Sequence, residues 1–288
     1  MKKKSLLKRI LIKALKLTST LFIENHLLQR TDYRIASPKI PPDFQGFKIL
    51  QLSDLHSACF GHENVRLIRK IDAVKPDMVV MTGDMISRSD FHHDVFFRLA
   101  QTLGAKYPCY YVVGNHELDM ERKEMKAFLV RLASMKIRVL ENEKTQITQN
   151  RQSINLYGLW LPLKHYREAK KKTGRTVPFI DRDMKRIMDV CDPSAFGILL
   201  AHNPLCFPVY ARWGADLSLS GHVHGGMLRL PLLGGLLSPE RKFLPEYSSG
   251  IYEIQDKKLL VSRGLGSGLF GARFLNRPEI VVITLEHC

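Results

Sequence analysis

The fold is decided by the stretch Phe47-Lys-Ile-Leu-Gln-Leu-Ser-Asp-Leu-His56, in which a largely apolar segment ends in an acid and a histidine. The apolar residues between 47 and 53 are typical of a buried strand. The same succession of apolar run and polar motif recurs in four later segments, at residues 78–84, 109–117, 197–203 and 217–225. In an open α/β sheet, ligand-binding groups gather outside the carboxyl ends of the strands. We therefore expect the five motifs to meet at one site.

The motifs supply carboxylate, imidazole and amide oxygen, which are ligands for hard or borderline divalent metals. In chain order they are Asp54-Leu-His56, Gly83-Asp84, Gly114-Asn-His-Glu117, Ala201-His-Asn203 and Gly221-His-Val-His-Gly225. One motif alone carries little weight, because Gly-Asp is a common dipeptide and a single loop histidine usually makes an ordinary hydrogen bond. The complete set, in order and after strands, predicts a metal centre. Its glycines are expected to permit tight turns and close backbone approach.

The ordered motifs resemble the calcineurin-like metallophosphoesterase superfamily, whose pattern runs D-x-H, G-D, G-N-H-[DE], H and G-H-x-H. The likeness covers residues 47–285. It implies an α/β fold in which two packed mixed β-sheets are flanked by helices. It also implies a metal-dependent phosphoric ester hydrolase with two divalent metal ions. Manganese, iron and zinc all suit the mixed oxygen and nitrogen ligands, so the metal stays open.

The resemblance also implies a role for each motif residue. Two metal ions about 3.5–4 Å apart ionise a shared water and neutralise phosphoryl oxygens, so a metal-bridging hydroxide would be the nucleophile. A carboxylate can bridge two cations with its two oxygens, and Asp84 is the candidate. The ligands of one ion would be Asp54, His56, Asp84 and His224, and those of the other Asp84, Asn115, His202 and His222. The catalytic residue would be His116, which stabilises or protonates the leaving oxygen, with Glu117 orienting it.

Residues beyond the ligands distinguish branches of the superfamily. The segment Gly83-Asp-Met-Ile-Ser-Arg88-Ser lacks the second Asp and the final Gly of the phosphoprotein phosphatases. Residues 51–56, 224–226 and 262–279 are instead similar to bacterial membrane-associated phosphodiesterases of the YaeI/YkuE type, a group related to UDP-2,3-diacylglucosamine hydrolases. Val223 and Met227 stand where this group commonly has Thr and Gln. Neither is an implied ligand, so these departures bear on substrate contacts and not on the metals.

These features favour hydrolysis of a phosphodiester or pyrophosphate bond in an anionic substrate, with a lipid-linked compound such as UDP-2,3-diacylglucosamine as one candidate. A phosphomonoesterase stays open, because the metal ligands do not distinguish the two reactions. A non-catalytic scaffold of the same fold is a further alternative, and a nuclease is suggested by net charge alone. Arg263, Arg273 and Arg277 are candidate phosphate contacts, since guanidinium binds phosphate bidentately, although structural roles are equally compatible with the sequence.

The N-terminal segment carries much of the positive charge. The formal net charge is +16, and seven Lys or Arg residues lie among the first sixteen residues. At helical spacing, Leu7, Leu11 and Leu21 fall on one face, as in a helix lying on an anionic membrane surface. The other face carries Lys8, Arg9, Lys13 and Lys16. The apolar runs are too short to cross a bilayer. We expect peripheral membrane association, on the cytoplasmic face; an ordinary first helix packed on the domain is the alternative.

The sequence also indicates how the chain is divided into segments. We expect the membrane-associating segment at 1–28, a proline-stiffened connector at 29–46 and one metallophosphoesterase domain at 47–288. Residues 161–180 are charged and fit a cap or substrate loop. The five cysteines contain no CxxC pair, which argues against a disulfide framework and a thiolate zinc site. No specific nucleic-acid motif is present, and the oligomeric state is not encoded in any pattern we recognise.

Overall fold

The computed structural model describes residues 27–88, 93–166, 177–226, 229–230, 234–235, 244–266, 273 and 275–288. The expected amphipathic segment at 1–28 therefore lies outside the described residues except for its last two. Residues 167–176, within the expected cap at 161–180, lie outside them as well. Within the described ranges, no helix is both long and apolar enough to span a bilayer.

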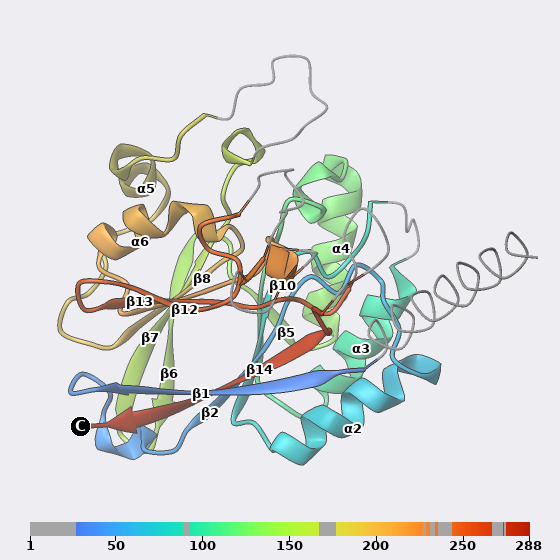
Figure 1. The fold of residues 1–288 in the computed structure, drawn as a ribbon, viewed down its shortest axis with the longest axis horizontal. Helices are drawn as coiled ribbons and strands as arrows, with labels where there is room; N and C mark the ends of the chain where they lie inside the picture. The colour runs from blue at the N-terminus through green and yellow to red at the C-terminus, as the bar shows by residue number, and fades with distance from the viewer. Residues whose placement is uncertain are drawn as a thin grey trace, which may run out of the picture.

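Two six-stranded β-sheets form the centre of the molecule (Figure 1). The first has the order β1-β14-β2-β3-β4-β5. Its strands β2 to β5 are parallel to one another, and β14 runs antiparallel to β2. Their bounds are β1 Gln29–Ser37, β2 Lys48–Leu52, β3 Met78–Thr82, β4 Cys109–Val112, β5 Ile137–Val139 and β14 Glu279–His287.

The second sheet has the order β12-β13-β9-β8-β7-β6, again with a parallel centre and an antiparallel strand at each edge. Its strands are β6 Glu143–Gln149, β7 Gln152–Leu159, β8 Gly197–Ala201, β9 Leu217–Ser220, β12 Gly250–Ile254 and β13 Lys257–Val261. A two-stranded ribbon, β10 Arg229–Leu230 and β11 Gly234–Gly235, lies apart from both sheets. The two packed mixed sheets confirm the fold expected from the sequence.

Helices cover the outer faces of both sheets (Figure 1). Helices α2 Val65–Val74, α3 Asp94–Gly104 and α4 Arg122–Ser134 contribute to the core of the first sheet, and α5 Asp181–Ile187 and α6 Phe207–Trp213 to that of the second. Side chains alternate along β8, so that Ile198 and Leu200 join the core between the sheets while Leu199 and Ala201 join the core under α5 and α6. Strands buried on both faces explain the continuous apolar runs in the sequence.

A buried amide joins the two sheets beneath the motifs. Gln51, in β2, is fully buried and donates through Nε2 to Thr82 Oγ1 and to the carbonyl oxygen of Ser220, both at 3.0 Å. Thr82 ends β3 in the first sheet, and Ser220 ends β9 in the second. These hydrogen bonds fix how far the end of β9 lies along the direction of β2 and β3. The loops that follow these strands therefore begin side by side.

Several elements were not expected from the sequence. Residues 29–37, within the range expected to be a connector, form the edge strand β1 and pair in parallel with β14 over nine residue pairs. Strand β6 and helices α5 and α6 were also missed. Apart from the buried Ile35, β1 alternates intermediate and exposed positions, with Arg30 and Asp32 exposed, so its sequence lacks the continuous apolar run of the inner strands. Its pairing partner lies some 250 residues away, which no local pattern reveals.

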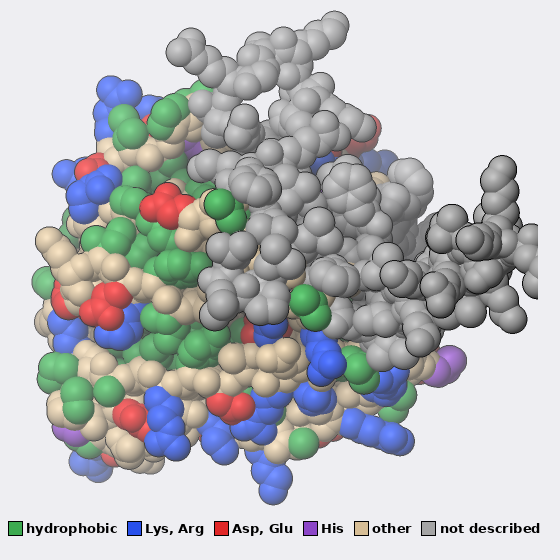
Figure 2. All heavy atoms as spheres, viewed as in Figure 1, with side chains coloured by type: hydrophobic (Ala, Val, Ile, Leu, Met, Phe, Trp, Pro, Cys, Tyr) green, Lys and Arg blue, Asp and Glu red, His purple; other side chains and the backbone are tan. Residues whose placement is uncertain are grey.

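Charged side chains are mixed over the described part of the surface. In the view of Figure 2, Lys and Arg side chains lie along the lower edge of the molecule and are interspersed with Asp and Glu. The dense basic run of the first sixteen residues lies outside the described residues. The described part of this face therefore offers no continuous basic band of the kind that tracks a nucleic-acid backbone.

Candidate metal centre

The structure brings the five motifs together at the carboxyl ends of strands from both sheets. Asp54 follows β2, Asp84 follows β3, and Asn115 and His116 follow β4. His202 follows β8 in the second sheet, and the segment with His222 and His224 follows β9. The groups capable of binding metal cluster in three overlapping sets. The first is Asp54–His56–His224, the second Asp84–His202–His222 and the third His56–Asp84–His116. All eight residues named from the sequence are adjacent to the junction of the sheets.

The first set converges on one point. His56 Nε2 lies 3.0 Å from His224 Nε2, and Asp54 Oδ1 lies 3.5 Å from His224 Nε2 and 4.0 Å from His56 Nε2. Two nitrogen ligands at 2.0–2.1 Å from one tetrahedral ion would lie about 3.3 Å apart. The spacing of these three donor atoms therefore fits a single cation.

The second set lies beside the first. His202 Nε2 is 3.1 Å from Asp84 Oδ2 and 3.9 Å from Asp54 Oδ1, so it faces carboxylates from both sets. The side-chain oxygen of Asn115 is buried and has no hydrogen-bond partner among the described residues. Buried polar atoms normally have partners, so an orphaned oxygen beside two acids and several imidazoles fits a metal ligand. Asp84 belongs to two of the three sets, as expected for a bridging carboxylate.

Hydrogen bonds hold the ligand atoms in orientation. His202 Nδ1 lies 2.6 Å from the carbonyl oxygen of Thr82, so this nitrogen donates and Nε2 is turned toward Asp84 and Asp54. The backbone N–H of His116 donates to Asp84 Oδ1 at 2.8 Å, and Oδ2 faces the histidines. The backbone N–H of His222 donates to both oxygens of Asp54, at 3.0 and 3.1 Å. These hydrogen bonds with the main chain fix the side-chain orientation of His202, Asp84 and Asp54 before any ion is bound.

The backbone at the motifs is strained. Positive φ angles occur at five of the acidic and histidine residues, namely Asp54 (51°), His56 (46°), Asp84 (51°), His222 (69°) and His224 (51°). Few non-glycine residues adopt this left-handed region. Such strain persists only where the surrounding structure imposes it, and it concentrates at functional sites. The sharp turns direct consecutive side chains inward instead of letting them alternate across a strand.

Glycines supply the space that these turns need. A Cβ atom on Gly221 would lie 2.2 Å from Asp54 Oδ2, and one on Gly114 would lie 2.2 Å from Asp84 Oδ1. Gly264, from the tail of the chain, has φ of 72° and would place a Cβ 2.7 Å from that of Asp54. The first two glycines belong to motifs identified from the sequence. The contribution of Gly264 was missed, although the tail containing it had been noted for its resemblance.

Burial and charge set the protonation of the site. Burial opposes ionisation of Asp84, but the imidazoles of His202 and His116 hold its pKa well below the usual range. Burial lowers the pKa of His56 to about 3 and that of His224 well below its usual value, so both offer neutral lone pairs. His202 is also buried, yet Asp84 and Asp54 raise its pKa to about 9. A cation would replace the proton that His202 otherwise holds between the two carboxylates.

Glu117 does not orient His116 as expected from the resemblance. Its fully buried carboxylate accepts hydrogen bonds from the backbone N–H groups of Asp84, Met85, Ile86 and Gly114, at 2.7 to 3.2 Å. Burial and the charge of Asp84 raise the pKa of Glu117 to about 7, against the effect of these donors. Glu117 therefore ties the loop after β3 to the loop after β4 and fixes Asp84 in place.

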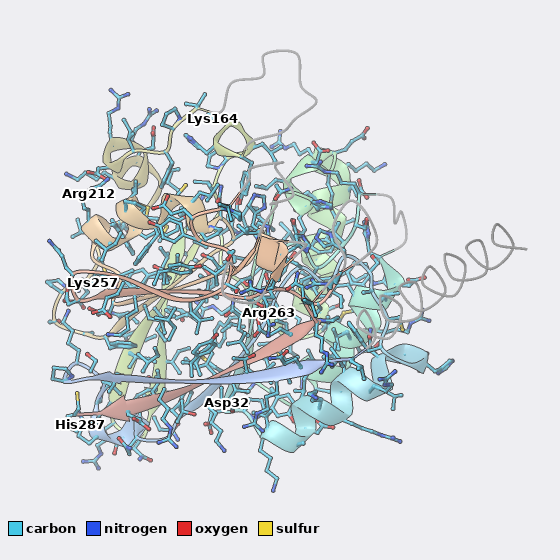
Figure 3. The ribbon with its side chains drawn as sticks, in the orientation of Figure 1. Asp32, Lys164, Arg212, Lys257, Arg263 and His287 are labelled. Carbon is cyan, nitrogen blue, oxygen red and sulfur yellow. The ribbon has the colours of Figure 1, made fainter. Side chains whose placement is uncertain are left out.

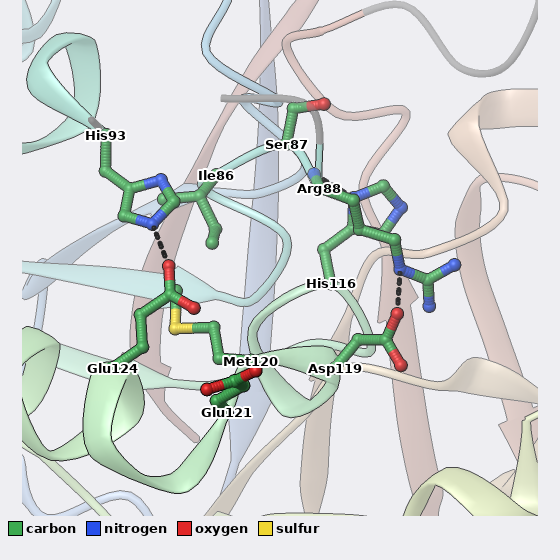
Figure 4. Close-up of a pocket in the computed structure, with 9 residues that line it drawn as sticks. All are labelled: Ile86, Ser87, Arg88, His93, His116, Asp119, Met120, Glu121 and Glu124. Carbon is green, nitrogen blue, oxygen red and sulfur yellow. Dashed lines mark hydrogen bonds and ion pairs between the residues drawn. The ribbon is translucent and has the colours of Figure 1, made fainter. Parts of the chain in front are cut away.

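His116 faces both the acids and an adjoining cavity. Its Nε2 lies 3.9 Å from Asp84 Oδ2, and the ring is partly exposed. Figure 4 shows the cavity, of about 180 Å³, with His116 on one wall beside Arg88 and Asp119, whose side chains form an ion pair at 3.2 Å. His93, Glu121 and Glu124 line the side further from His116. A group leaving from the metal centre past His116 would enter this cavity.

Two of the three candidate phosphate arginines serve the scaffold. Arg263, labelled in Figure 3, pairs with Glu279 at 2.9 Å. Arg273 is almost fully buried and donates to the carbonyl oxygens of Gly266, Asn276 and Arg263. Arg277 is exposed. Arg273 holds the tail whose Gly266 N–H donates to the Asp54 carbonyl at 2.6 Å, so it stabilises the backbone of an acidic motif.

The fold and the clustered acids and histidines define a metal-dependent phosphoester hydrolase. Residues 47–226 match the family model of the calcineurin-like phosphoesterases, and the chain belongs to this family. It is 31% identical to the metallophosphoesterase YkuE of Bacillus subtilis, over 92% of this chain and 88% of the relative. It is 28% identical to phosphodiesterase YaeI of Escherichia coli (83% and 82%) and 26% identical to the UDP-2,3-diacylglucosamine pyrophosphatase LpxG of Chlamydia muridarum (90% and 91%).

The close packing of Gly114 against Asp84 predicts that Gly114→Ala destabilises the protein. The added methyl would meet Asp84 Oδ1 at 2.2 Å and the Asp84 nitrogen at 2.5 Å, so we expect a loss of about 1–3 kcal/mol in the free energy of unfolding. Urea denaturation measures this loss. Gly197→Ala is the matched control, because its nearest contact would be an ordinary 3.4 Å from Tyr157. Equal stability of the two variants would contradict the close packing of Gly114 on Asp84.

The four donors around Glu117 predict that Glu117→Gln is strongly destabilising. The amide nitrogen would face backbone N–H groups, leaving buried donors unsatisfied at a cost of about 2–4 kcal/mol. Thermal unfolding monitored by circular dichroism measures the change. Glu141→Gln, at an exposed position, should unfold within about 1 °C of the parent chain. A parent-like Glu117→Gln protein would show that these hydrogen bonds contribute little.

Proposed function

We propose that the chain is a dinuclear metallophosphoesterase that hydrolyses a phosphodiester or pyrophosphate bond. The proposed ligands of one ion are Asp54, His56, Asp84 and His224. Those of the other are Asp84, Asn115, His202 and His222, with Asp84 as the bridge. The observation that carries this proposal is the convergence of the two donor sets on either side of Asp84, within 4.8 Å in each set. The donors are of the mixed oxygen and nitrogen type that manganese, iron and zinc accept.

The bound ions would supply a water that ionises at neutral pH and positive charge opposite the phosphoryl oxygens. The rest of the reaction falls to side chains of this chain. His116 lies at the border between the proposed metal ligands and the cavity of Figure 4, so its Nε2 is placed to give a proton to the departing oxygen. The Arg88–Asp119 pair beside it limits the orientations open to the leaving group.

The proposed substrate is an anionic diester or pyrophosphate, with a lipid-linked compound such as UDP-2,3-diacylglucosamine as a specific candidate. Support comes from the relatives, one named a phosphodiesterase and another a UDP-2,3-diacylglucosamine pyrophosphatase. The cavity beside His116 also supports a substrate with a substantial second group, because a simple monoester would need only the phosphoryl site. Membrane association through residues 1–28, on the cytoplasmic face, would bring the centre to such a substrate.

Hydrolysis of bis-p-nitrophenyl phosphate and p-nitrophenyl phosphate tests the proposed reaction. After treatment with chelator, we expect no turnover, and added Mn²⁺ should restore activity with preference for the diester. His116→Ala should lower kcat by about 100-fold or more while metal content, measured by elemental analysis, stays at two ions per chain. Preference for the monoester would favour a phosphomonoesterase. Two bound ions without turnover of either compound would favour a non-catalytic scaffold.

Co-sedimentation with liposomes tests the proposed membrane association. The seven basic residues of the first sixteen should each contribute about 1 kcal/mol at an anionic surface, so binding should require anionic lipid and weaken at high salt. The matched protein begins at residue 27 and should remain in the supernatant while hydrolysing bis-p-nitrophenyl phosphate at the parent rate. Equal sedimentation of both proteins would place the membrane contact elsewhere.

A further inference from the structure

Tyr166 is a buried tyrosine whose hydroxyl has no partner. The residue is 4% exposed, and its hydroxyl oxygen makes no hydrogen bond within the described part of the chain. Leaving a buried hydroxyl unsatisfied costs free energy, so such a group needs an explanation. The hydroxyl of Tyr210, another fully buried tyrosine, by contrast donates to the Asn203 carbonyl at 2.9 Å.

The ring of Tyr166 packs against two proposed metal ligands. Its centroid lies 5.2 Å from that of His222, edge to face, and 6.1 Å from that of His202. The rings of His202 and His222 also contact each other, at 5.1 Å. The three rings therefore pack together at the second donor set. Neither His202 nor His222 donates a hydrogen bond to the Tyr166 hydroxyl.

The hydroxyl is in the protonated form that donates hydrogen bonds. A tyrosine hydroxyl has a pKa of about 10, so at neutral pH it carries its proton and can donate a hydrogen bond. The contacts of the Tyr166 ring with the rings of His202 and His222 place the residue beside the second donor set. An O–H donor there is suited to an anionic oxygen.

The segment that carries Tyr166 is held firmly. Tyr166 directly follows the short 3-10 helix Leu163–His165 and donates its backbone N–H to the Leu163 carbonyl. Residues next to Tyr166 are also tied to Val177, since Val177 N–H donates to the Lys164 carbonyl and His165 Nδ1 lies 2.9 Å from the Val177 carbonyl. The ring position is therefore set by the protein before any ligand binds, as preorganised binding requires.

We propose that the Tyr166 hydroxyl donates a hydrogen bond to a phosphoryl oxygen of the bound substrate, on the side of His202 and His222. This inference rests on the proposed phosphoesterase function. It assigns a substrate contact to the segment expected to form a substrate loop, and it explains the orphaned hydroxyl. The contact lies beside His202 and His222, which follow strands of the second sheet, so the phosphoryl group would be bounded by His116 toward the leaving group and by Tyr166 toward the second sheet.

The test is Tyr166→Phe, which keeps the ring contacts and removes only the oxygen. A hydrogen bond to a charged group changes a rate roughly 10- to 100-fold, and we expect kcat/KM for bis-p-nitrophenyl phosphate to fall by that factor. The inhibition constant for inorganic phosphate should rise by roughly 10-fold. Bound metal should stay unchanged, and Tm should stay equal or rise because an unsatisfied polar atom has been removed.

Tyr157→Phe is the matched control. Tyr157 is 1% exposed, and its hydroxyl accepts a hydrogen bond from the Asp192 N–H at 3.1 Å, before the start of β8 and away from the motifs. This variant should lose Tm and keep kcat/KM within about twofold. Opposite patterns in the two variants would separate substrate binding by Tyr166 from a role in folding.

The results that would overturn the inference are distinct from those that would overturn the function. Parent-like kcat/KM and phosphate inhibition in Tyr166→Phe would refute the contact, as would a loss of Tm that accompanies the loss of activity. If the parent chain hydrolyses nothing, the proposed function fails and the contact is judged by thermal shift with Mn²⁺ and inorganic phosphate. Phosphate should then stabilise the parent more than Tyr166→Phe, and equal or absent shifts would refute the contact.

Discussion

The structure depends on keeping two carboxylates buried at the junction of two sheets, those of Asp54 and Asp84, which lie 3.9 and 3.1 Å from the same His202 Nε2. Both are at most 2% exposed. Burying one unpaired charge is costly, and burying two like charges side by side is costlier still. The arrangement is stable only if positive charge or many hydrogen-bond donors surround the pair. Divalent cations are the simplest source of that charge, and four imidazoles at this junction are positioned to hold them.

The scaffold meets this constraint with its backbone. The N–H groups of His222 and His116 donate to Asp54 and Asp84 respectively, while Glu117 gathers four N–H groups of the loops around Asp84. Left-handed turns at the acids and histidines bring neighbouring side chains to the same side. These turns would unfold readily in isolation. They persist because the strands beneath them are buried on both faces and because Gln51 locks the two sheets in register.

The surroundings of the acids differ on their two sides. Toward β4, partly exposed His116 opens onto a polar cavity with an ion pair, where a departing group finds room. Toward the second sheet, the buried ring of Tyr166 packs against the rings of His202 and His222, and its hydroxyl has no partner among the described residues. A phosphoryl group bound as proposed would meet the partly exposed His116 on one side and the buried Tyr166 on the other.

The sequence by itself determined the buried strands and the acids and histidines that cluster at their carboxyl ends, because these depend on local signals, and its resemblance to a known family supplied the two-sheet architecture. Apolar runs mark buried strands, and a polar motif after each strand lies at the carboxyl edge whatever the order of the strands. The tertiary structure alone decided the rest. β1 lacks an apolar pattern and exists because β14, far along the chain, supplies its hydrogen bonds. Glu117 and Arg273 looked like site residues but serve the backbone, and Tyr166 bore no motif yet lies against two histidines. Such roles depend on the direction in which a side chain points in the packed interior. The packing of segments that are distant in the chain cannot be predicted from the sequence of any one segment.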